Sequence, residues 1–147
     1  MNIRPAERKD VTAIFDLIKE LALYEKAPEQ VTNTTFQLEI DLFDDKICHA
    51  IVAEEKNEIV GFALYYISYS TWKGRCLYLE DFYVKESNRQ QGIGGLLFEE
   101  IVSIAQTLQV KRMDWQVLEW NEPAIQFYKK YDAILDPEWL NGRLFFS

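Results

Sequence analysis

The sequence is poor in side chains that hold metal ions or form disulfides. It has one histidine, His49, and two cysteines, Cys48 and Cys76, in 147 residues. Two cysteines do not make a metal site, and each lies in an apolar or strand-like segment where a free thiol behaves as a small hydrophobic side chain. We therefore expect no metal ion and no need for a disulfide.

Long apolar runs and an excess of basic residues are missing as well. No run approaches the roughly 20 residues of a membrane-spanning helix, and residues 1–5 lead into a structured pattern without the apolar core of a signal peptide. Lysine and arginine total 16 against 24 acidic residues, a net charge of −8, which argues against nucleic acid as a partner and is compatible with a cationic substrate. We expect a cytoplasmic protein that binds neither membranes nor nucleic acid.

Length and composition are those of one globular domain. Hydrophobic residues make up 48% of the chain and charged residues 27%, which excludes a disordered chain. A chain of this length can bury about two-thirds of its unfolded surface in a single core. We predict one domain over residues 1–147.

The most informative stretch is a strand, a glycine-rich turn and a helix. Residues 77–84 carry leucines, aromatics and a valine at both parities, which is typical of an interior strand buried on both faces. After the turn, apolar residues form one stripe of an amphipathic helix at Leu97, Ile101, Ile104 and Leu108. Glycines let a ligand approach the backbone, and the first N–H groups of a helix attract anions, so the turn predicts a phosphate-binding site.

The spacing of the glycines separates the candidate phosphate ligands. A nucleoside-triphosphate loop needs a Lys-Ser/Thr pair that is missing here, and a dinucleotide loop needs a third glycine where Leu97 stands. The stretch Arg89-Gln90-Gln91-Gly92-Ile93-Gly94 instead fits the R/Q-x-x-G-x-G/A pattern of the GCN5-related N-acetyltransferases (GNATs), whose loop cradles the pyrophosphate of acetyl-CoA. A glycine-bearing turn without a ligand is the remaining alternative.

The resemblance to this family extends over nearly the whole chain. Residues 78–84 and the stretch Trp120-Asn121-Glu122-Pro123 with its continuation to residue 129 resemble the diamine (spermidine/spermine) N-acetyltransferase branch. The resemblance implies an α/β (α+β) fold with a mixed, mostly antiparallel central sheet flanked by helices, acetyl-CoA as co-substrate, and a homodimer. It also implies the residues that bind the cofactor: Phe82, Tyr83, Val84, Arg89, Gln90, Gln91, Gly92, Ile93, Gly94, Gly95, Asn121 and Tyr128.

Three side chains are candidates for the chemistry of acetyl transfer to an amine. The carboxylates of Glu80 and Asp81 are adjacent in a strand that otherwise reads as core, where charges are costly unless partnered or used. Successive strand residues point to opposite faces, so an unbulged strand would aim only one of them at a site. The resemblance selects Glu80 as the base, Asp81 as a substrate ligand and Tyr128 as the acid for the leaving thiolate. Structural carboxylates and a packed helix aromatic are the alternative interpretations.

The substrate is less clearly specified than the cofactor. The resemblance implies that Trp72 and Tyr24 line the amine pocket, but Ser70 stands where the family has an acid, Asp132 replaces a glycine, and Trp139 is displaced. These departures make small amines, including amino acids with a side-chain amine such as thialysine, candidates beside polyamines. A non-catalytic acyl-CoA-binding or regulatory domain of the same fold, and an unrelated phosphate-binding module, are the alternative functions.

The remaining elements follow from local patterns. His49 lies in a predicted strand far from the glycine loop, which favours an ordinary strand position over a catalytic base. Thr34 or Thr35 and Asn121 are candidate helix N-caps, and Lys56-Asn57 is a candidate hairpin turn. We predict strands at residues 2–4, 47–53, 59–66, 112–118, 133–135 and 143–146, and helices at residues 10–27 and 34–43 and after residue 121.

Overall fold

A computed structural model describes residues 1–146 of the chain. The chain groups into two compact units, one spanning Met1–Gln116 and one from Val117 onward. The first unit contains the sheet and its main helices, and the second contains one short helix and an extended segment. The expectation of a single domain over the whole chain stays a prediction.

The first unit is built on a five-stranded sheet in the order β1-β2-β3-β4-β5. Neighbouring strands from β1 to β4 pair antiparallel, and β4 pairs with β5 in parallel. This confirms the predicted mixed, mostly antiparallel sheet. The strands are β1 (Asn2–Pro5), β2 (His49–Glu55), β3 (Glu58–Ser70), β4 (Gly74–Val84) and β5 (Arg112–Asp114).

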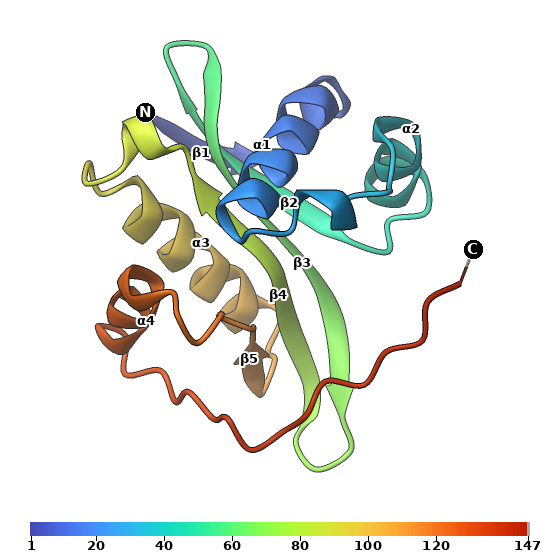
Figure 1. The fold of residues 1–147 in the computed structure, drawn as a ribbon, viewed down its shortest axis with the longest axis vertical. Coiled ribbons are helices and arrows are strands. Elements are labelled where there is room, and N and C mark those ends of the chain that lie inside the picture. Colours follow the sequence, from blue (N-terminus) through green and yellow to red (C-terminus); the bar gives the residue numbers. More distant parts are fainter. Residues whose placement is uncertain (147) are drawn as a thin grey trace. The chain divides into compact units, whose positions relative to one another are not determined.

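Helices cover both faces of this sheet (Figure 1). Helices α1 (Val11–Tyr24) and α2 (Thr35–Glu39), the latter continued by a π-helical turn at Ile40–Asp44, lie on one face, and α3 (Ile93–Thr107) lies on the other. The second unit contains α4 (Glu122–Lys129). Of the two predicted candidates, Thr34 is the N-cap of α2, because its hydroxyl accepts the N–H of Gln37 at 3.1 Å. Among residues 1–146, no helix is both long enough and apolar enough to cross a membrane.

Each face of the sheet packs against its own helices. Toward α1 and α2 the core joins side chains of the helices to those of β2, β3 and β4, including Ile14, Leu17, Phe62 and Leu64. Toward α3 the backbone approaches closely at Gly61, where an added Cβ would lie 3.1 Å from Cδ1 of Leu97. The small residue in β3 therefore lets α3 lie close to the sheet at Leu97.

Several element boundaries differ from the sequence predictions. β3 and β4 are longer than predicted and pair as far as Ser70 and Gly74, so their hairpin extends beyond the end of β2 (Figure 1). β5 ends at Asp114 instead of residue 118, and the predicted strands at residues 133–135 and 143–146 are not formed. A strand needs a neighbouring strand to pair its backbone, and apolar composition does not supply one.

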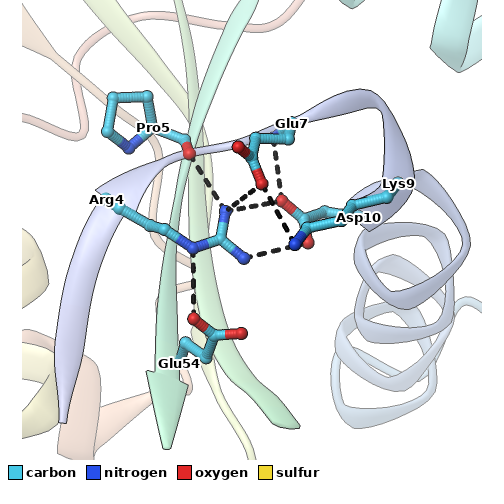
Figure 2. A network of polar contacts seen from close by, with 6 residues as sticks. All are labelled: Arg4, Pro5, Glu7, Lys9, Asp10 and Glu54. Atoms are coloured by element: carbon cyan, nitrogen blue, oxygen red, sulfur yellow. Dashed lines mark hydrogen bonds and ion pairs between the residues drawn. The ribbon is translucent and has the colours of Figure 1, made fainter. Parts of the chain in front are cut away.

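A network of polar contacts joins β1 to the start of α1 (Figure 2). Arg4 donates from Nη1 and Nη2 to both carboxylate oxygens of Asp10, at 2.7 and 3.1 Å, and from Nε to Glu54 at 3.2 Å. Burial alone would raise the pKa of Asp10, but the hydrogen bonds from Arg4 and from the N–H of Glu7 lower it below its ordinary value. Asp10, the N-cap residue of α1, is therefore a buried anion held by a bidentate guanidinium.

Replacing Arg4 with methionine is expected to destabilise the protein by about 3 kcal/mol, because it leaves a buried carboxylate without its partner. Urea unfolding followed by circular dichroism measures the change. Arg8→Ala is the matched control: Arg8 also pairs with two acids, Glu39 and Asp44, but at an exposed position where such pairs contribute little. Equal losses in the two variants would contradict the proposed importance of the buried network.

Candidate active site

The central feature of the site is an irregularity in the pairing of β3 and β4. Leu64 is opposite Asp81 and Tyr65 is opposite Leu79, so Glu80 has no residue opposite it. Such an extra residue is a β-bulge, which disturbs the alternation of side chains between the two faces. In a regular strand, only one of the neighbouring carboxylates Glu80 and Asp81 could point toward a given site. Because β4 is irregular at this position, that expectation does not apply to it.

The electrostatics indicate that the two carboxylates lie close together. The pKa of Asp81 is raised to about 7, first by burial, then by the charges of Glu80 and Glu25. The pKa of Glu25, the residue at the C-terminal end of α1, is raised by burial and by Glu80. Asp81 is opposite Leu64, which belongs to the core that α1 shares with the sheet, and the charges of Glu80 and Glu25 act on it there.

Two tyrosines border this carboxylate cluster, which we define as Glu25, Glu80 and Asp81. The rings of Tyr66 and Tyr78 stack with centroids 5.3 Å apart. Burial raises the pKa of both phenols, and the charge of Glu80 raises it further. Aromatic faces beside carboxylates suit a cation that carries a hydrocarbon chain. Glu25, Tyr66 and Tyr78 were not among the predicted site residues, although Glu25 directly follows Tyr24 in the sequence.

The glycine loop ends at the N-terminus of α3. Gly92 is the N-cap residue and has φ +82°, and Gln90 has φ +65°. The first N–H groups of the helix, including those of Ile93, Gly94 and Gly95, have no partner within the helix. An added Cβ at Gly92 would meet nothing within 4 Å, so the space beside this glycine is open. The loop therefore fits a phosphate group, as its sequence predicts.

Arg89 lies between this loop and two aromatic rings. Its Nε donates to the carbonyl oxygen of Val84 at 3.0 Å, and its guanidinium lies 5.2 Å from the ring centroid of Tyr24 and 5.3 Å from that of Tyr83. Phe82 packs edge-on against Phe98 at 5.8 Å. The side chains of residues 82–84 are thus occupied within the protein, and their predicted contribution to cofactor binding would come from the backbone.

Among residues 1–146, the second half of β4 pairs with no strand other than β3. The parallel ladder to β5 joins Cys76, Leu77 and Tyr78 to residues 112–114 and ends there. From Leu79 onward, the side of β4 that faces β5 is outside this ladder. The carboxylates and the residues leading to the glycine loop lie in this half of β4.

Two of the candidates lie away from the carboxylate cluster. Trp72 lies in the turn between β3 and β4 and is 85% exposed, and the hydroxyl of Ser70 accepts the N–H groups of Trp72 and Lys73 at 3.2 and 3.1 Å. At about 3.3 Å per strand residue, Gly74 and Glu80 are separated by about 20 Å. His49 lies on the first position of β2, 5.4 Å from the ring of Tyr65, and lines a cavity of about 380 Å³ with α3 residues.

The second unit holds the two remaining candidates. Asn121 is the N-cap of α4, as predicted, and its Oδ1 accepts the N–H of Ala124 at 3.4 Å. Tyr128 is the buried residue of this helix, and its ring meets that of Phe127 edge-on at 5.5 Å. Asp132 has φ +59°, a left-handed conformation that glycine adopts more readily than aspartate. The roles of Asn121 and Tyr128 toward a ligand stay predictions.

Comparison with known proteins identifies the family. The acetyltransferase (GNAT) family model matches residues 11–132. The chain belongs to the GNAT family. It is 40% identical to the thialysine N-epsilon-acetyltransferase of Bos taurus, over 89% of this chain and 82% of the bovine protein. It is 34% identical to the protein of the same name from Caenorhabditis elegans, over 82% of this chain and 75% of the nematode protein.

Solved structures agree with the family at the level of the fold. An aminoglycoside acetyltransferase from an uncultured soil metagenomic sample, in complex with trehalose, aligns with a TM-score of 0.81 at 17% identity. The alignment covers 99% of this chain and 96% of that one. The mixed sheet with flanking helices is therefore the GNAT fold, and the protein is an acetyltransferase of that family.

Replacing Asp81 with asparagine is expected to change how the stability of this GNAT protein depends on pH. The pKa of Asp81 is about 7 in the folded chain against an ordinary 3.8, so between these values the folded state holds a proton that the unfolded state has released. Wild-type stability therefore falls as pH rises from about 4 to 7, by up to about 1 kcal/mol per pH unit. Asp81→Asn removes most of this fall.

Thermal unfolding at intervals from about pH 5 to pH 8 measures the effect. Glu29→Gln is the matched control, because it removes a carboxylate at an exposed position in the turn Pro28–Gln30. We expect the control to keep the wild-type pH dependence and Asp81→Asn to exceed the wild type in stability above pH 7. If the stability of Asp81→Asn depends on pH as that of the wild type does, the carboxyl of Asp81 in the wild-type protein titrates at its ordinary value.

Proposed function

We propose that this GNAT protein transfers an acetyl group from acetyl-CoA directly to a primary amine of a small cationic substrate. The observation that supports this most is the carboxylate cluster of Glu25, Glu80 and Asp81, in which Asp81 has a pKa of about 7. Such a cluster attracts an ammonium group, and a carboxyl that titrates near neutral pH can accept a proton there. The cluster therefore suits both binding and deprotonation of an amine.

The substrate class follows from the position of the cluster. Trp72 and Glu80 are joined by an extended strand about 20 Å long, so a short amine held at the cluster would not reach the exposed tryptophan. Ser70 supplies no negative charge at the hairpin turn, where its hydroxyl accepts two backbone N–H groups. Both features favour a small amine, such as an amino acid with a side-chain amine, over a long polyamine. The names of the bovine and nematode relatives, both thialysine acetyltransferases, agree with this substrate class.

The proposed cofactor site is the glycine loop with the N-terminus of α3. The backbone N–H groups between Gln90 and Gly95, the guanidinium of Arg89 and the positive end of the helix dipole would hold the pyrophosphate. When bound, acetyl-CoA supplies the acetyl group as a reactive thioester. Asn121 contributes near the pantetheine arm in this proposal.

Proton transfer and ammonium binding are assigned to three side chains. Glu80 assists removal of a proton from the ammonium, and Asp81 binds the ammonium beside it. Tyr128 donates its phenolic proton to the departing thiolate. Neither cysteine supplies a nucleophile for an acetyl-enzyme: Cys76 is buried, and burial together with Asp41 raises the pKa of the Cys48 thiol, which disfavours the thiolate.

Steady-state kinetics with acetyl-CoA and amines of increasing length, following thiol release, test the proposal. We expect turnover with short amines. With the best amine, Tyr128→Phe should lower kcat by about 10²- to 10⁴-fold, because a positioned acid is lost, and should leave acetyl-CoA affinity unchanged. Glu80→Gln should shift the alkaline rise of the pH–rate profile, since the amine would then depend on bulk base.

Cys76→Ala and Cys48→Ala are the controls for direct transfer and should keep near wild-type turnover. Acetyl-CoA binding without thiol release from any amine would favour the non-catalytic alternative. Wild-type turnover in Tyr128→Phe, with chemistry rate-limiting, would remove Tyr128 from the mechanism.

We also propose that the protein forms a homodimer through its apolar chain end. Leu144, Phe145 and Phe146 are at least 82% exposed, and residues 143–146, expected as a strand, have no strand partner within the described chain. Exposed apolar residues in a row are a typical interface feature, and a second copy would cover them in an isologous contact.

Analytical ultracentrifugation at micromolar concentration tests this proposal. We expect a dimeric mass for the wild type and a monomeric mass when Leu144, Phe145 and Phe146 are all changed to serine. Phe36→Ser, which removes one aromatic that is 74% exposed on α2, is the control and should stay dimeric. A monomeric wild type would end the proposal.

A further inference from the structure

Arg89, the first residue of the loop motif, is held from three directions. Its Nε donates to the carbonyl oxygen of Val84 at 3.0 Å, where β4 ends. The rings of Tyr24 and Tyr83 lie 5.2 and 5.3 Å from the guanidinium carbon. This hydrogen bond uses only the Nε–H group, and the four N–H groups on the two Nη atoms take no part in it. The side chain is thus oriented while most of its donors stay available for an anion.

Helix α1 supports both rings. Tyr24 is the last residue of α1, and the hydroxyl of Tyr83 donates to Oε1 of Glu20, one turn earlier in the same helix, at 3.3 Å. Tyr83 itself is 8% exposed, within the core that α1 shares with the sheet. A core helix and a core strand therefore fix the two faces against which the guanidinium lies. A cation between aromatic faces is attracted by both rings.

We propose that Tyr24 is a positioning residue for Arg89 in acetyl-CoA binding, and not a residue that contacts the amine. The inference rests on the proposed function, in which the loop binds the phosphates of acetyl-CoA. A guanidinium held in place before the ligand arrives loses less side-chain freedom on binding, which strengthens the complex. The ring of Tyr24 supplies that restraint, and its hydroxyl is dispensable for it.

Calorimetric titration with acetyl-CoA measures the effect without requiring turnover. Tyr24→Leu is expected to raise the Kd for acetyl-CoA by about 3- to 30-fold, the range for losing one cation–π contact. Tyr24→Phe keeps the ring and should stay within about twofold of the wild type. Tyr24→Met also removes the ring but keeps a long apolar side chain. It is the substitute if Tyr24→Leu folds poorly, and the same rise in Kd is expected. Leu23→Ala, at the neighbouring position that is 67% exposed, is the control.

A double-mutant cycle identifies Arg89 as the partner. In an Arg89→Leu background, Tyr24→Leu should not weaken acetyl-CoA binding any further. The KM for the amine at saturating acetyl-CoA should be unchanged by Tyr24→Leu. A full additional loss in the Arg89→Leu background, or a rise in amine KM with unchanged acetyl-CoA affinity, would overturn the inference. A wild-type protein that binds no acetyl-CoA would refute the proposed function itself, which is a different result.

Discussion

The candidate site depends on one extra residue in β4. Because Glu80 has no residue opposite it in β3, two neighbouring carboxylates act at the same place on the sheet. Like charges at short range in a half-buried position repel one another, and the pKa of Asp81 rises to about 7 as a result of burial and this repulsion. The folded chain therefore holds a strained arrangement of charge that a bound cation would relieve.

Helix α1 keeps this arrangement together from both of its ends. At its start, the buried Asp10 is clamped by Arg4 of β1, so the helix is tied to the edge of the sheet. At its end, Tyr24 lies against Arg89 of the glycine loop, and the next residue, Glu25, joins the carboxylate cluster. One helix thus relates the loop proposed for the cofactor to the carboxylates proposed for the amine, and its apolar face is part of the core.

Features that depend on neighbouring residues were predictable from the sequence. Thr34 and Asn121 cap their helices, Lys56 and Asn57 adopt the positive φ of a tight hairpin turn, and a helix follows the glycine loop. Patterns of this kind determine structure locally, since capping and turn formation involve residues only a few positions apart. The predicted closing strands were wrong because strand formation also requires a partner that the apolar pattern does not specify.

The sequence by itself determined the family, the glycine loop and the identity of the carboxylates, because those are written in residue types and short spacings. The bulge at Glu80, the approach of Glu25 and the position of Tyr24 over Arg89 were decided only by the tertiary structure. Each depends on the register or packing of segments far apart in the chain, and burial and charge proximity set a pKa only once those segments have come together.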